Sequence, residues 1–303
     1  METPPVCNYE GSDYQESFWE KGGREYEDAV EDIAIRRLLP DRGKLLLELG
    51  AGAGRNTARY GGYEEIVLLD FSHTQLEQAR RRLGDSSETG ESGSGHRYRY
   101  VAADIYRLPF VGGLFDGVTM IRTLHHMADA RLALSQVRRV MQTGGIFLLE
   151  FANKLNLKAI LRYAFGRQPW SPFSPEPIEF APLNFDFHPG TVRAWLRSSG
   201  FVIDRQLTVS HFRMGFLKRL IPLKVLVWLD SICQPTGSLW QFTPSVFLRA
   251  HSVGSGTQSG NGQFFCCPSC ATALEDTPPL LTCGNCGKEY PVVDGIYDFR
   301  VKE

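Results

Sequence analysis

Three closely spaced glycines beside an acidic residue are the first sign of chemistry in this chain. Gly50, Gly52 and Gly54 follow a short apolar run that contains Glu48. A strand that enters a glycine-rich turn leaves backbone N–H groups bare, so the turn can approach a nucleotide-like ligand closely. The dinucleotide pattern G-x-G-x-x-G would place its last glycine where this chain has Arg55. We therefore predict a nucleotide-like ligand, and the acidic strand end suits a cationic or polar ligand better than a diphosphate.

Two further carboxylates follow the next two strand-like runs. Asp70 ends the second run, where its side chain can accept hydrogen bonds from both hydroxyls of a ribose. Asp104 follows the third run, where it can meet the exocyclic amine of an adenine, and Ile105 beside it can pack on the ring. Acidic residues at two successive strand ends make the ligand prediction far more specific than the glycine turn alone.

The elements that must position these residues alternate between strand and helix. Strand-like apolar runs occur at 45–49, 66–70, 98–103, 117–121, 146–151, 202–209 and 242–248, and helical patterns occur at 56–60, 74–83, 130–141 and 191–199. Such alternation favours right-handed crossovers and a mostly parallel sheet with helices on both faces. We therefore predict an α/β fold of about seven strands, with the ligand beyond the carboxyl ends of the strands where their order reverses.

Residues 44–151 resemble a class I S-adenosylmethionine-dependent methyltransferase of the methyltransferase-11 type. The motifs that carry the resemblance are LLLELGAGAG, IVLLDFS, AADIYRLPF, FDGVTMIRTLHHM and RVMQTGGIFLLEF. The resemblance implies a Rossmann-like sheet that binds S-adenosylmethionine. Its implied cofactor-binding residues are Glu48, Gly50, Gly52 and Gly54 around the methionine part, Asp70 with its neighbour Phe71 at the ribose, and Asp104 with Ile105 at the adenine. For Arg55 and Asn56, cofactor contact and solvation of a helix start both stay open.

Two histidines after the fourth strand are the candidate catalytic residues. His125 and His126 carry imidazoles that titrate near neutral pH, so either can act as a general base. Neighbouring residues that leave a strand point in different directions, so we expect only one to face the site. His126 matches the position that resembles the HH of small-molecule and wobble-uridine carboxyl methyltransferases. The alternative is a histidine that is merely hydrogen-bonded at a strand end.

A basic and aromatic insertion is predicted to cover the site, at about residues 152–190 and 210–240. Between Lys154 and Lys224 there are eleven Lys or Arg and four Asp or Glu. Such a lid favours an anionic or planar acceptor, although a hydrophobic cover with solvated charges would have the same composition. The stretch 211–229 is both apolar and basic; we predict a buried connection that Pro222 interrupts, with contact to a membrane surface unlikely.

Four cysteines near the C-terminus have the spacing of a zinc site. Cys267, Cys270, Cys283 and Cys286 form C-x2-C-x12-C-x2-C, which suits tetrahedral zinc, and Cys266 is left out because its neighbour has the correct spacing. Residues 264–303 resemble the small zinc-ribbon protein that activates methyltransferases of the translation apparatus. They contain six acidic and three basic residues, which disfavours phosphate contact by this segment. We predict a structural zinc ion, Zn2+, in a scaffold or activator role.

Length and composition complete the expected organisation. The 303 residues carry a net charge of −1, with neither a signal peptide nor a long apolar segment, so we expect a cytoplasmic protein. The predicted domains are a methyltransferase domain at 1–250, a flexible linker at 251–263 and a zinc ribbon at 264–303. A polar tract at 84–95 is predicted to be a loop. The aromatic and basic residues predicted to cap the cofactor from the N-terminal segment are Tyr14, Trp19, Arg24 and Tyr26.

The predicted function is methyl transfer to an oxygen or carbon atom of a small molecule. The fourth strand lacks the Asn or Asp, two prolines and aromatic residue that are typical of family members that methylate amide or base amino nitrogens. One alternative is a methyltransferase of tRNA or of another translation component, with RNA as partner and the ribbon as built-in activator. Another is a non-catalytic S-adenosylmethionine-binding scaffold. The sequence identifies no protein partner.

Overall fold

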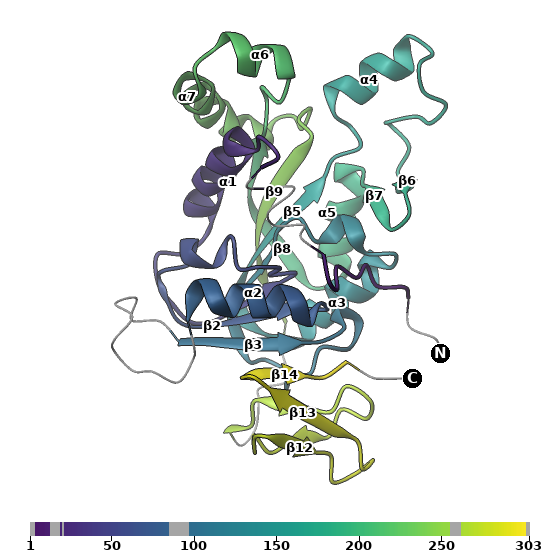
Figure 1. Cartoon of the computed structure of the whole chain (residues 1–303). Coiled ribbons are helices and arrows are strands. Elements are labelled where there is room, and N and C mark those ends of the chain that lie inside the picture. The colour runs from purple at the N-terminus through teal and green to yellow at the C-terminus, as the bar shows by residue number, and fades with distance from the viewer. Residues whose placement is uncertain (1–3, 13–18, 20, 85–96, 255–261, 301–303) are drawn as a thin grey trace.

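The computed structural model describes residues 4–12, 19, 21–84, 97–254 and 262–300. Ten strands form one sheet in the order β12-β13-β14-β3-β2-β1-β4-β5-β9-β8, and helices cover both of its faces (Figure 1). Its seven-stranded central part consists of β1 (Gly43–Leu49), β2 (Tyr63–Asp70), β3 (Arg97–Ala102), β4 (Phe115–Met120), β5 (Met141–Ala152), β8 (Phe201–Val209) and β9 (Ser245–Ser252). The predicted Rossmann-like α/β fold and all seven predicted strands are confirmed.

Strand order explains where a ligand can bind. β1 pairs in parallel with both β2 and β4, so the chain leaves β1 at the place where the strand order reverses. β2–β3 and β4–β5 are also parallel, whereas β9 runs antiparallel to β5 and β8. The last four residues of β1 are all buried, as expected for a strand with helices on both faces. The glycine turn therefore emerges at the centre of the sheet's carboxyl edge.

The helices form two groups by their place in the fold. Those beside the central sheet are α1 (Glu25–Leu38), α2 (His73–Leu83), α3 (Ala130–Val140) and α5 (Pro189–Ser198), and those of the insertions are α4 (Leu157–Ala164), α6 (Gly215–Leu220) and α7 (Leu223–Cys233). Single 3-10 turns are η2 (Thr57–Arg59), η3 (Ile105–Arg107), η4 (Leu124–His126) and η5 (Gln234–Ser238). The short hairpin of β6 (Ile178–Ala181) and β7 (Asn184–Asp186) completes the first insertion.

Two local predictions are wrong. The helix expected at 56–60 is the single turn η2, because the chain must return to β2 within a few residues. The stretch 211–229 is not a buried connection: it forms α6 and part of α7, whose outward side chains include Leu220 at 76% and Trp228 at 60% exposure. Pro222 does interrupt it, since α6 ends before this residue and α7 begins after it. Helix α1 was not predicted.

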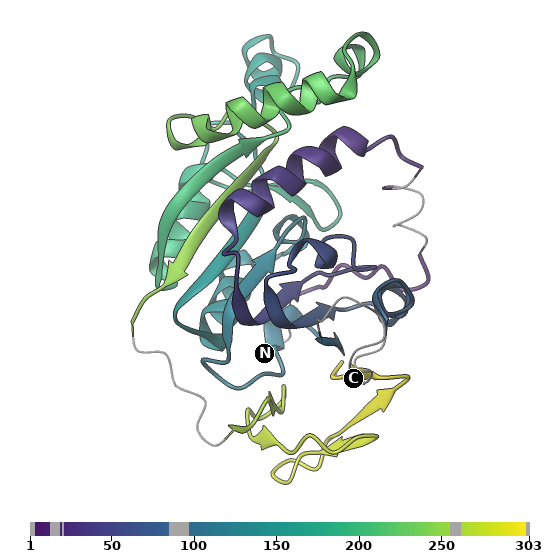
Figure 2. The same ribbon diagram turned by 90° about the vertical axis from the view of Figure 1, so that its left-hand side faces the viewer.

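The C-terminal residues extend the sheet rather than standing apart from it. The strands β10 (Phe265–Cys266), β11 (Ala273–Leu274), β12 (Leu280–Thr282), β13 (Glu289–Val293) and β14 (Ile296–Asp298) form this region. β14 pairs in parallel with β3, and Figure 2 shows the whole region along that edge of the sheet. Phe265 and Phe299 belong to the same hydrophobic core as the central strands. The predicted linker at 251–263 and loop at 84–95 lie largely outside the described residues.

None of the helices in the described ranges combines the length and the apolar character that crossing a bilayer demands.

Candidate functional site

A pocket at the carboxyl edge of the central sheet brings most of the predicted ligand-binding residues together. It lies where β1, β2, β3 and β4 end, and the N-terminal segment contributes to its wall. Its lining residues are Val6, Cys7, Tyr9, Trp19, Glu48, Gly50, Ala51, Gly52, Ala53, Arg55, Asn56, Leu69, Asp70, Phe71, Gln75, Ala103, Ile105, Ile121, Arg122, Thr123, His126 and Met127. Of the predicted site residues, Gly54, Asp104 and His125 are absent from this lining.

The three glycines of the turn have different surroundings. All have positive φ angles, which L side chains rarely adopt. A Cβ atom on Gly50 would lie 2.3 Å from Oγ1 of Thr123, so this position has no room for a side chain. At Gly52 a Cβ would meet only the Gln75 side chain at 3.9 Å, so the bare backbone here faces open pocket. Gly54 instead packs on α2 through Leu83 and its neighbours.

Asp70 ties the glycine turn to the start of α2. Its Oδ2 accepts a hydrogen bond from the Gly52 backbone N–H at 2.9 Å, and its Oδ1 accepts one from Ser72 N–H at the same distance. Each carboxylate oxygen keeps a further lone pair, and the residue lines the pocket, so it can still accept bonds from a ligand. Burial raises the pKa of Asp70 above its ordinary value.

Glu48 is a buried carboxyl whose direct partners are hydroxyl groups. Thr57 Oγ1 donates to it at 2.6 Å and the Tyr60 hydroxyl at 3.3 Å, and the residue is 4% exposed. Burial raises its pKa to about 7, although the hydrogen bonds from Thr57 and Tyr60 act to lower it. A cation placed beside this carboxyl would favour its charged form. A buried carboxyl of this kind suits a ligand that carries positive charge.

The third strand end places one predicted residue in the pocket and one outside it. Ile105 and Phe71 line the pocket and give it apolar walls. Asp104 uses Oδ1 to accept the Tyr106 backbone N–H at 2.8 Å, which begins the turn η3. Burial raises its pKa. Its predicted contact with an adenine stays a prediction.

Only one of the two histidines reaches the pocket. His126 lines it, whereas His125 is absent from the lining, and the two ring centroids are 4.0 Å apart. Nδ1 of His126 is 3.1 Å from the Leu183 carbonyl oxygen, which can only accept, so this nitrogen carries the proton. Nε2 is then an acceptor in neutral imidazole, and it lies 3.1 Å from the Tyr9 hydroxyl. Burial lowers the pKa of both histidines, most strongly that of His125.

The N-terminal segment contributes residues that the sequence did not single out. Tyr9 meets His126, and Val6 and Cys7 line the pocket beside it. Of the four predicted capping residues, Trp19 lines the pocket and Tyr14 lies outside the described residues. Tyr26 and Arg24 bind elsewhere: the Tyr26 hydroxyl donates to Asp230 at 2.7 Å, and Arg24 pairs with Glu27 at 3.3 Å. The contacts of Tyr9 and Tyr26 join residues that the sequence pattern alone does not bring together.

A buried ion network supports the wall that contains Trp19. The guanidinium of Arg55 stacks 3.5 Å from the Trp19 ring centroid and pairs with Glu31 at 3.0 Å. Arg122, a non-glycine residue with φ of 55°, also pairs with Glu31. Burial alone would raise the pKa of Glu31, but Arg122 and Arg55 outweigh burial and hold it below its ordinary value. Arg55 and Asn56 both reach the pocket, so ligand contact is open to them.

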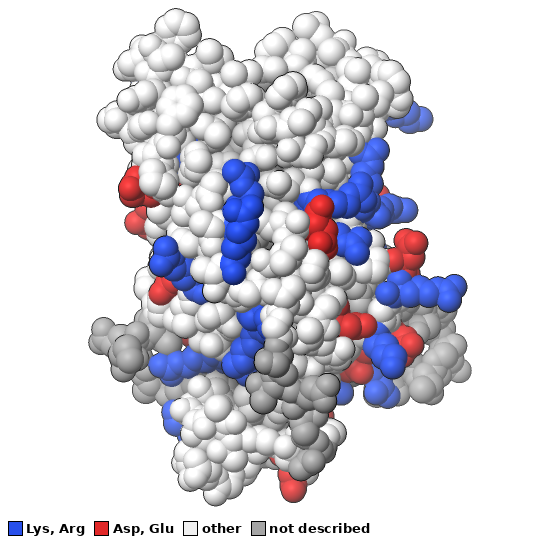
Figure 3. Space-filling model, turned by 180° about the vertical axis from the view of Figure 1, so that it is seen from behind, with Lys and Arg blue, Asp and Glu red and all other residues white. Residues whose placement is uncertain are grey.

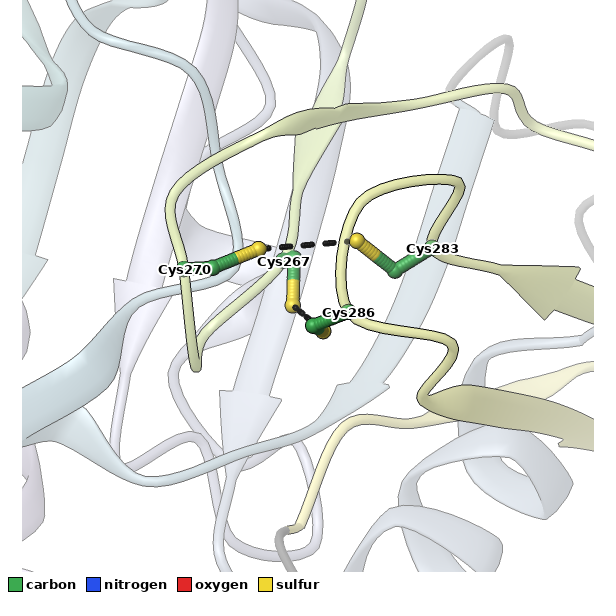
Figure 4. A group of neighbouring side chains, drawn as sticks. All are labelled: Cys267, Cys270, Cys283 and Cys286. Carbon is green, nitrogen blue, oxygen red and sulfur yellow. Dashed lines mark hydrogen bonds between the residues drawn. The ribbon is translucent and has the colours of Figure 1, made fainter.

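The four predicted metal-binding cysteines form one cluster (Figure 4). The Sγ atoms of Cys267, Cys270, Cys283 and Cys286 lie within 4.8 Å of one another. Cys267 and Cys286 are 3.6 Å apart, and Cys270 and Cys283 are 3.5 Å apart. Tetrahedral zinc with Zn–S bonds of about 2.3 Å separates its sulfur ligands by roughly 3.8 Å. The cluster is therefore compatible with zinc, and Cys266 is not part of it, since its sulfur lies 3.0 Å from the Phe110 carbonyl oxygen.

The central part of the chain is similar to known methyltransferases. Residues 47–149 match the family model described as a methyltransferase domain. An O-methyltransferase, cnsE, of Penicillium expansum is 33% identical over 134 residues, which are 42% of this chain and 46% of that protein. The demethylmenaquinone methyltransferase of Clavibacter sepedonicus is 34% identical over 119 residues, 39% of this chain and 45% of that protein. The matched segment thus spans less than half of each of these relatives.

Solved structures share the fold more widely. A complex of the Haloferax volcanii Trm112 methyltransferase activator with a protein named as a methyltransferase matches with a TM-score of 0.53 and 15% identity, over 80% of this chain and 96% of that chain. The [4+2]-cyclase SpnF matches with a TM-score of 0.50 and 21% identity, over 75% of this chain and 82% of that chain. Since one match is named as a cyclase, the fold does not define the reaction by itself.

Proposed function

We propose that this chain, whose residues 47–149 form a methyltransferase domain, uses S-adenosylmethionine to methylate an oxygen or carbon atom of a small molecule. The observation that carries the proposal is the pocket itself. It gathers Glu48, the bare backbone of Gly52, Asp70 and Ile105 from three neighbouring strand ends. Carboxylates at two of these ends suit a cationic nucleoside better than a diphosphate.

The residues of the chain fit each part of such a cofactor. Asp70 has free lone pairs for ribose hydroxyls, and Ile105 with Phe71 offers apolar walls to a planar base. Glu48 offers a buried carboxyl toward positive charge. When bound, the cofactor supplies an electrophilic methyl group, so the protein has to align the acceptor and remove its proton.

His126 is the residue that we assign to proton removal. Its Nδ1–H is held by the Leu183 carbonyl, which leaves Nε2 as the acceptor toward Tyr9. Because burial lowers its pKa, the imidazole is neutral at pH 7 and can accept a proton. The hydroxyl of a methyl acceptor can pass its proton to Nε2 of His126 through the Tyr9 hydroxyl. It can also pass the proton directly, if it occupies the position of the Tyr9 hydroxyl. Names of the relatives, an O-methyltransferase and a demethylmenaquinone methyltransferase, support oxygen or carbon as the methylated atom.

Calorimetry with S-adenosylhomocysteine tests the cofactor assignment. We expect binding by the wild type, and at least about tenfold weaker binding by Asp70→Asn, because one carboxylate acceptor is lost. Asp204→Asn is the matched control, since Asp204 is also an acidic residue on a strand of the sheet but lies outside the pocket lining. NADH serves as a dinucleotide competitor. Absence of heat with S-adenosylhomocysteine, or tighter binding of NADH, would overturn the assignment.

Transfer of a labelled methyl group tests the acceptor class. The protein is incubated with labelled S-adenosylmethionine and a fractionated cell extract, and label is counted in organic-soluble metabolites, RNA and protein. We expect label in the metabolite fraction, and loss of the signal in His126→Phe, which keeps an aromatic ring but has no proton acceptor. Label in RNA or protein alone would show that the small-molecule assignment is wrong.

We also infer that residues 264–303 form a zinc ribbon, joined through 251–263 to a methyltransferase domain at 1–250. The four clustered sulfurs support a structural Zn2+ ion. Metal analysis of the purified protein should give one zinc per chain, which Cys283→Ser removes. Cys266→Ser is the matched control, because this neighbouring cysteine points away from the cluster. Equal zinc content in both variants would contradict the assignment.

A further inference from the structure

One end of the molecule presents an unusually apolar surface. Helices α6 and α7 lie at the end opposite β12–β14, and α4 lies at the same end but apart from them, as Figure 1 shows. We call residues 157–165, 214–232 and 239–242 the apolar end. Its exposed large side chains include Phe165 (72%), Phe216 (57%), Leu220 (76%), Trp228 (60%), Leu239 (76%) and Trp240 (54%). Most of the exposed large apolar side chains in the described ranges lie in this region.

Packing inside the chain uses only one face of these helices. Helix α7 turns Leu226 and Asp230 inward, and Asp230 is held by the Tyr26 hydroxyl of α1 and by His211. The outward face of the same helix carries Trp228 and Ile232, both more than half exposed. A helix that is apolar on its inner and outer faces normally has a partner on each side. Exposed apolar side chains gathered at one end of a molecule in this way are typical of an interaction site.

The charges of this region indicate which partner fits. Its segments and the residue just beyond α4 carry the exposed bases Lys158, Arg162, Arg167, Arg219 and Lys224. Their only carboxylate among residues 157–167, 214–232 and 239–242 is Asp230, which is fully buried. In Figure 3 the outer edge of this end shows uncharged surface and no Asp or Glu. Apolar and aromatic side chains flanked by bases without acids are the composition of surfaces that lie in an anionic bilayer interface.

We propose that the apolar end docks on the surface of an anionic lipid bilayer. Its aromatic and aliphatic side chains enter the boundary between headgroups and acyl chains, while the bases meet lipid phosphates. From the sequence alone, contact with a membrane surface was predicted to be unlikely, because residues 211–229 were predicted to be buried. A second copy of the chain fits less well, since a symmetric contact would bring the same bases together with no exposed carboxylate to pair them.

Sedimentation with lipid vesicles tests the proposal on the full, zinc-loaded chain. The probes are vesicles of phosphatidylcholine alone and of phosphatidylcholine with one quarter phosphatidylglycerol. We expect binding to the anionic vesicles to be at least about tenfold stronger and to weaken with salt. Arg219→Glu with Lys224→Glu should weaken binding to the anionic vesicles about tenfold or more relative to the wild type. The matched control is Arg42→Glu with Lys44→Glu, two exposed bases outside the apolar end, which should leave binding unchanged.

A second pair of variants tests the apolar contact. Trp228→Ser with Trp240→Ser should reduce binding to anionic vesicles about tenfold, whereas Val202→Ser with Val293→Ser, at exposed positions elsewhere, should not. Circular dichroism checks that each variant is folded. No vesicle binding, or equal loss in the variants and their controls, would overturn the proposal. So would a concentration-dependent dimer that the tryptophan variant abolishes while vesicles stay unbound. None of these measurements depends on methyl transfer, so the proposed function can fail independently.

Discussion

The two ends of the molecule are both rich in apolar and aromatic residues, but only one of them buries these residues. At the zinc-ribbon end, Phe265 is 0% and Phe299 is 1% exposed, because β14 lies directly beside β3. At the apolar end, Phe216 and Trp228 are more than half exposed. Aromatic content alone therefore does not define a core. An apolar segment becomes part of the core when it packs against an edge or a face of the sheet. An apolar segment that does not pack in this way stays exposed and can bind a partner outside the chain.

The two ends are also attached in different ways. The ribbon end is held by strand pairing, shared aromatic packing and the predicted zinc site. The apolar end is held by Leu226 of α7, which is buried in a core shared with α1, and by polar contacts. The Tyr26 hydroxyl of α1 and His211 bind Asp230, and Lys218 of α6 pairs with Glu27 at 2.6 Å. We expect the first attachment to contribute to the stability of the whole fold. The second can loosen locally, which suits a surface that has to adapt to a partner.

Removal of zinc should have the largest effect and tests whether the ribbon belongs to the common core. A structural zinc ion can contribute on the order of 10 kcal/mol to folding of a small domain. Because Phe265 and Phe299 share the core of the central sheet, Cys283→Ser should lower the main thermal midpoint by roughly 10 °C or more. Cys233→Ser, a lone cysteine on α7, is the control. A main transition that stays in place would show that the two units fold independently.

A matched pair of phenylalanine truncations compares the two ends directly. Phe265→Ala removes a fully buried ring and should lower the free energy of unfolding by about 3–5 kcal/mol. Phe216→Ala removes an exposed ring and should change it by no more than about 0.5 kcal/mol. Urea unfolding followed by circular dichroism measures both. Equal losses would mean that the apolar end is packed in solution, and the contrast between the ends would disappear.

Arg300 should link the ribbon end to the pocket with a smaller effect. Its guanidinium contacts the Glu10 carboxylate at 3.1 Å and the Phe71 carbonyl at 3.4 Å, and Glu10 in turn accepts the His73 N–H at 2.9 Å. Arg300→Gln should therefore weaken S-adenosylhomocysteine binding about fivefold, which corresponds to about 1 kcal/mol. Calorimetry measures it, and Lys288→Gln on the exposed ribbon surface is the control. Unchanged affinity of Arg300→Gln for S-adenosylhomocysteine would show that the ribbon does not contribute to cofactor binding through Arg300.

The sequence predicted the elements whose signals are local. The first strand is a short apolar run followed by Gly50, and the spacing from Cys267 to Cys286 is itself typical of a metal site. Helix α1 was missed because Glu27 and Glu31 interrupt its apolar pattern, and the arginines that neutralise Glu31 come from distant segments. The contact of Tyr9 with His126 joins residues far apart in the chain. Burial of 211–229 was mispredicted because composition does not show which neighbours the fold supplies.

The smallest expected effect concerns acid, and it tests the polar attachment of the apolar end. Burial alone would raise the pKa of Glu27, but the hydrogen bond from Lys218, with the charges of Lys218 and Arg213, outweighs burial and holds it below its ordinary value of 4.5. A carboxyl whose pKa is depressed in the folded state stabilises the fold above its unfolded pKa, and this contribution is lost as the pH falls through the folded pKa. The free energy of unfolding should therefore drop below pH 4.5 in the wild type by more than in Glu27→Gln, in which this position cannot titrate. Urea titrations of both proteins between pH 7 and pH 3 measure the difference. Because the cysteine cluster is the same in both proteins, its own response to acid cancels, and identical pH profiles would show that Glu27 does not anchor α6.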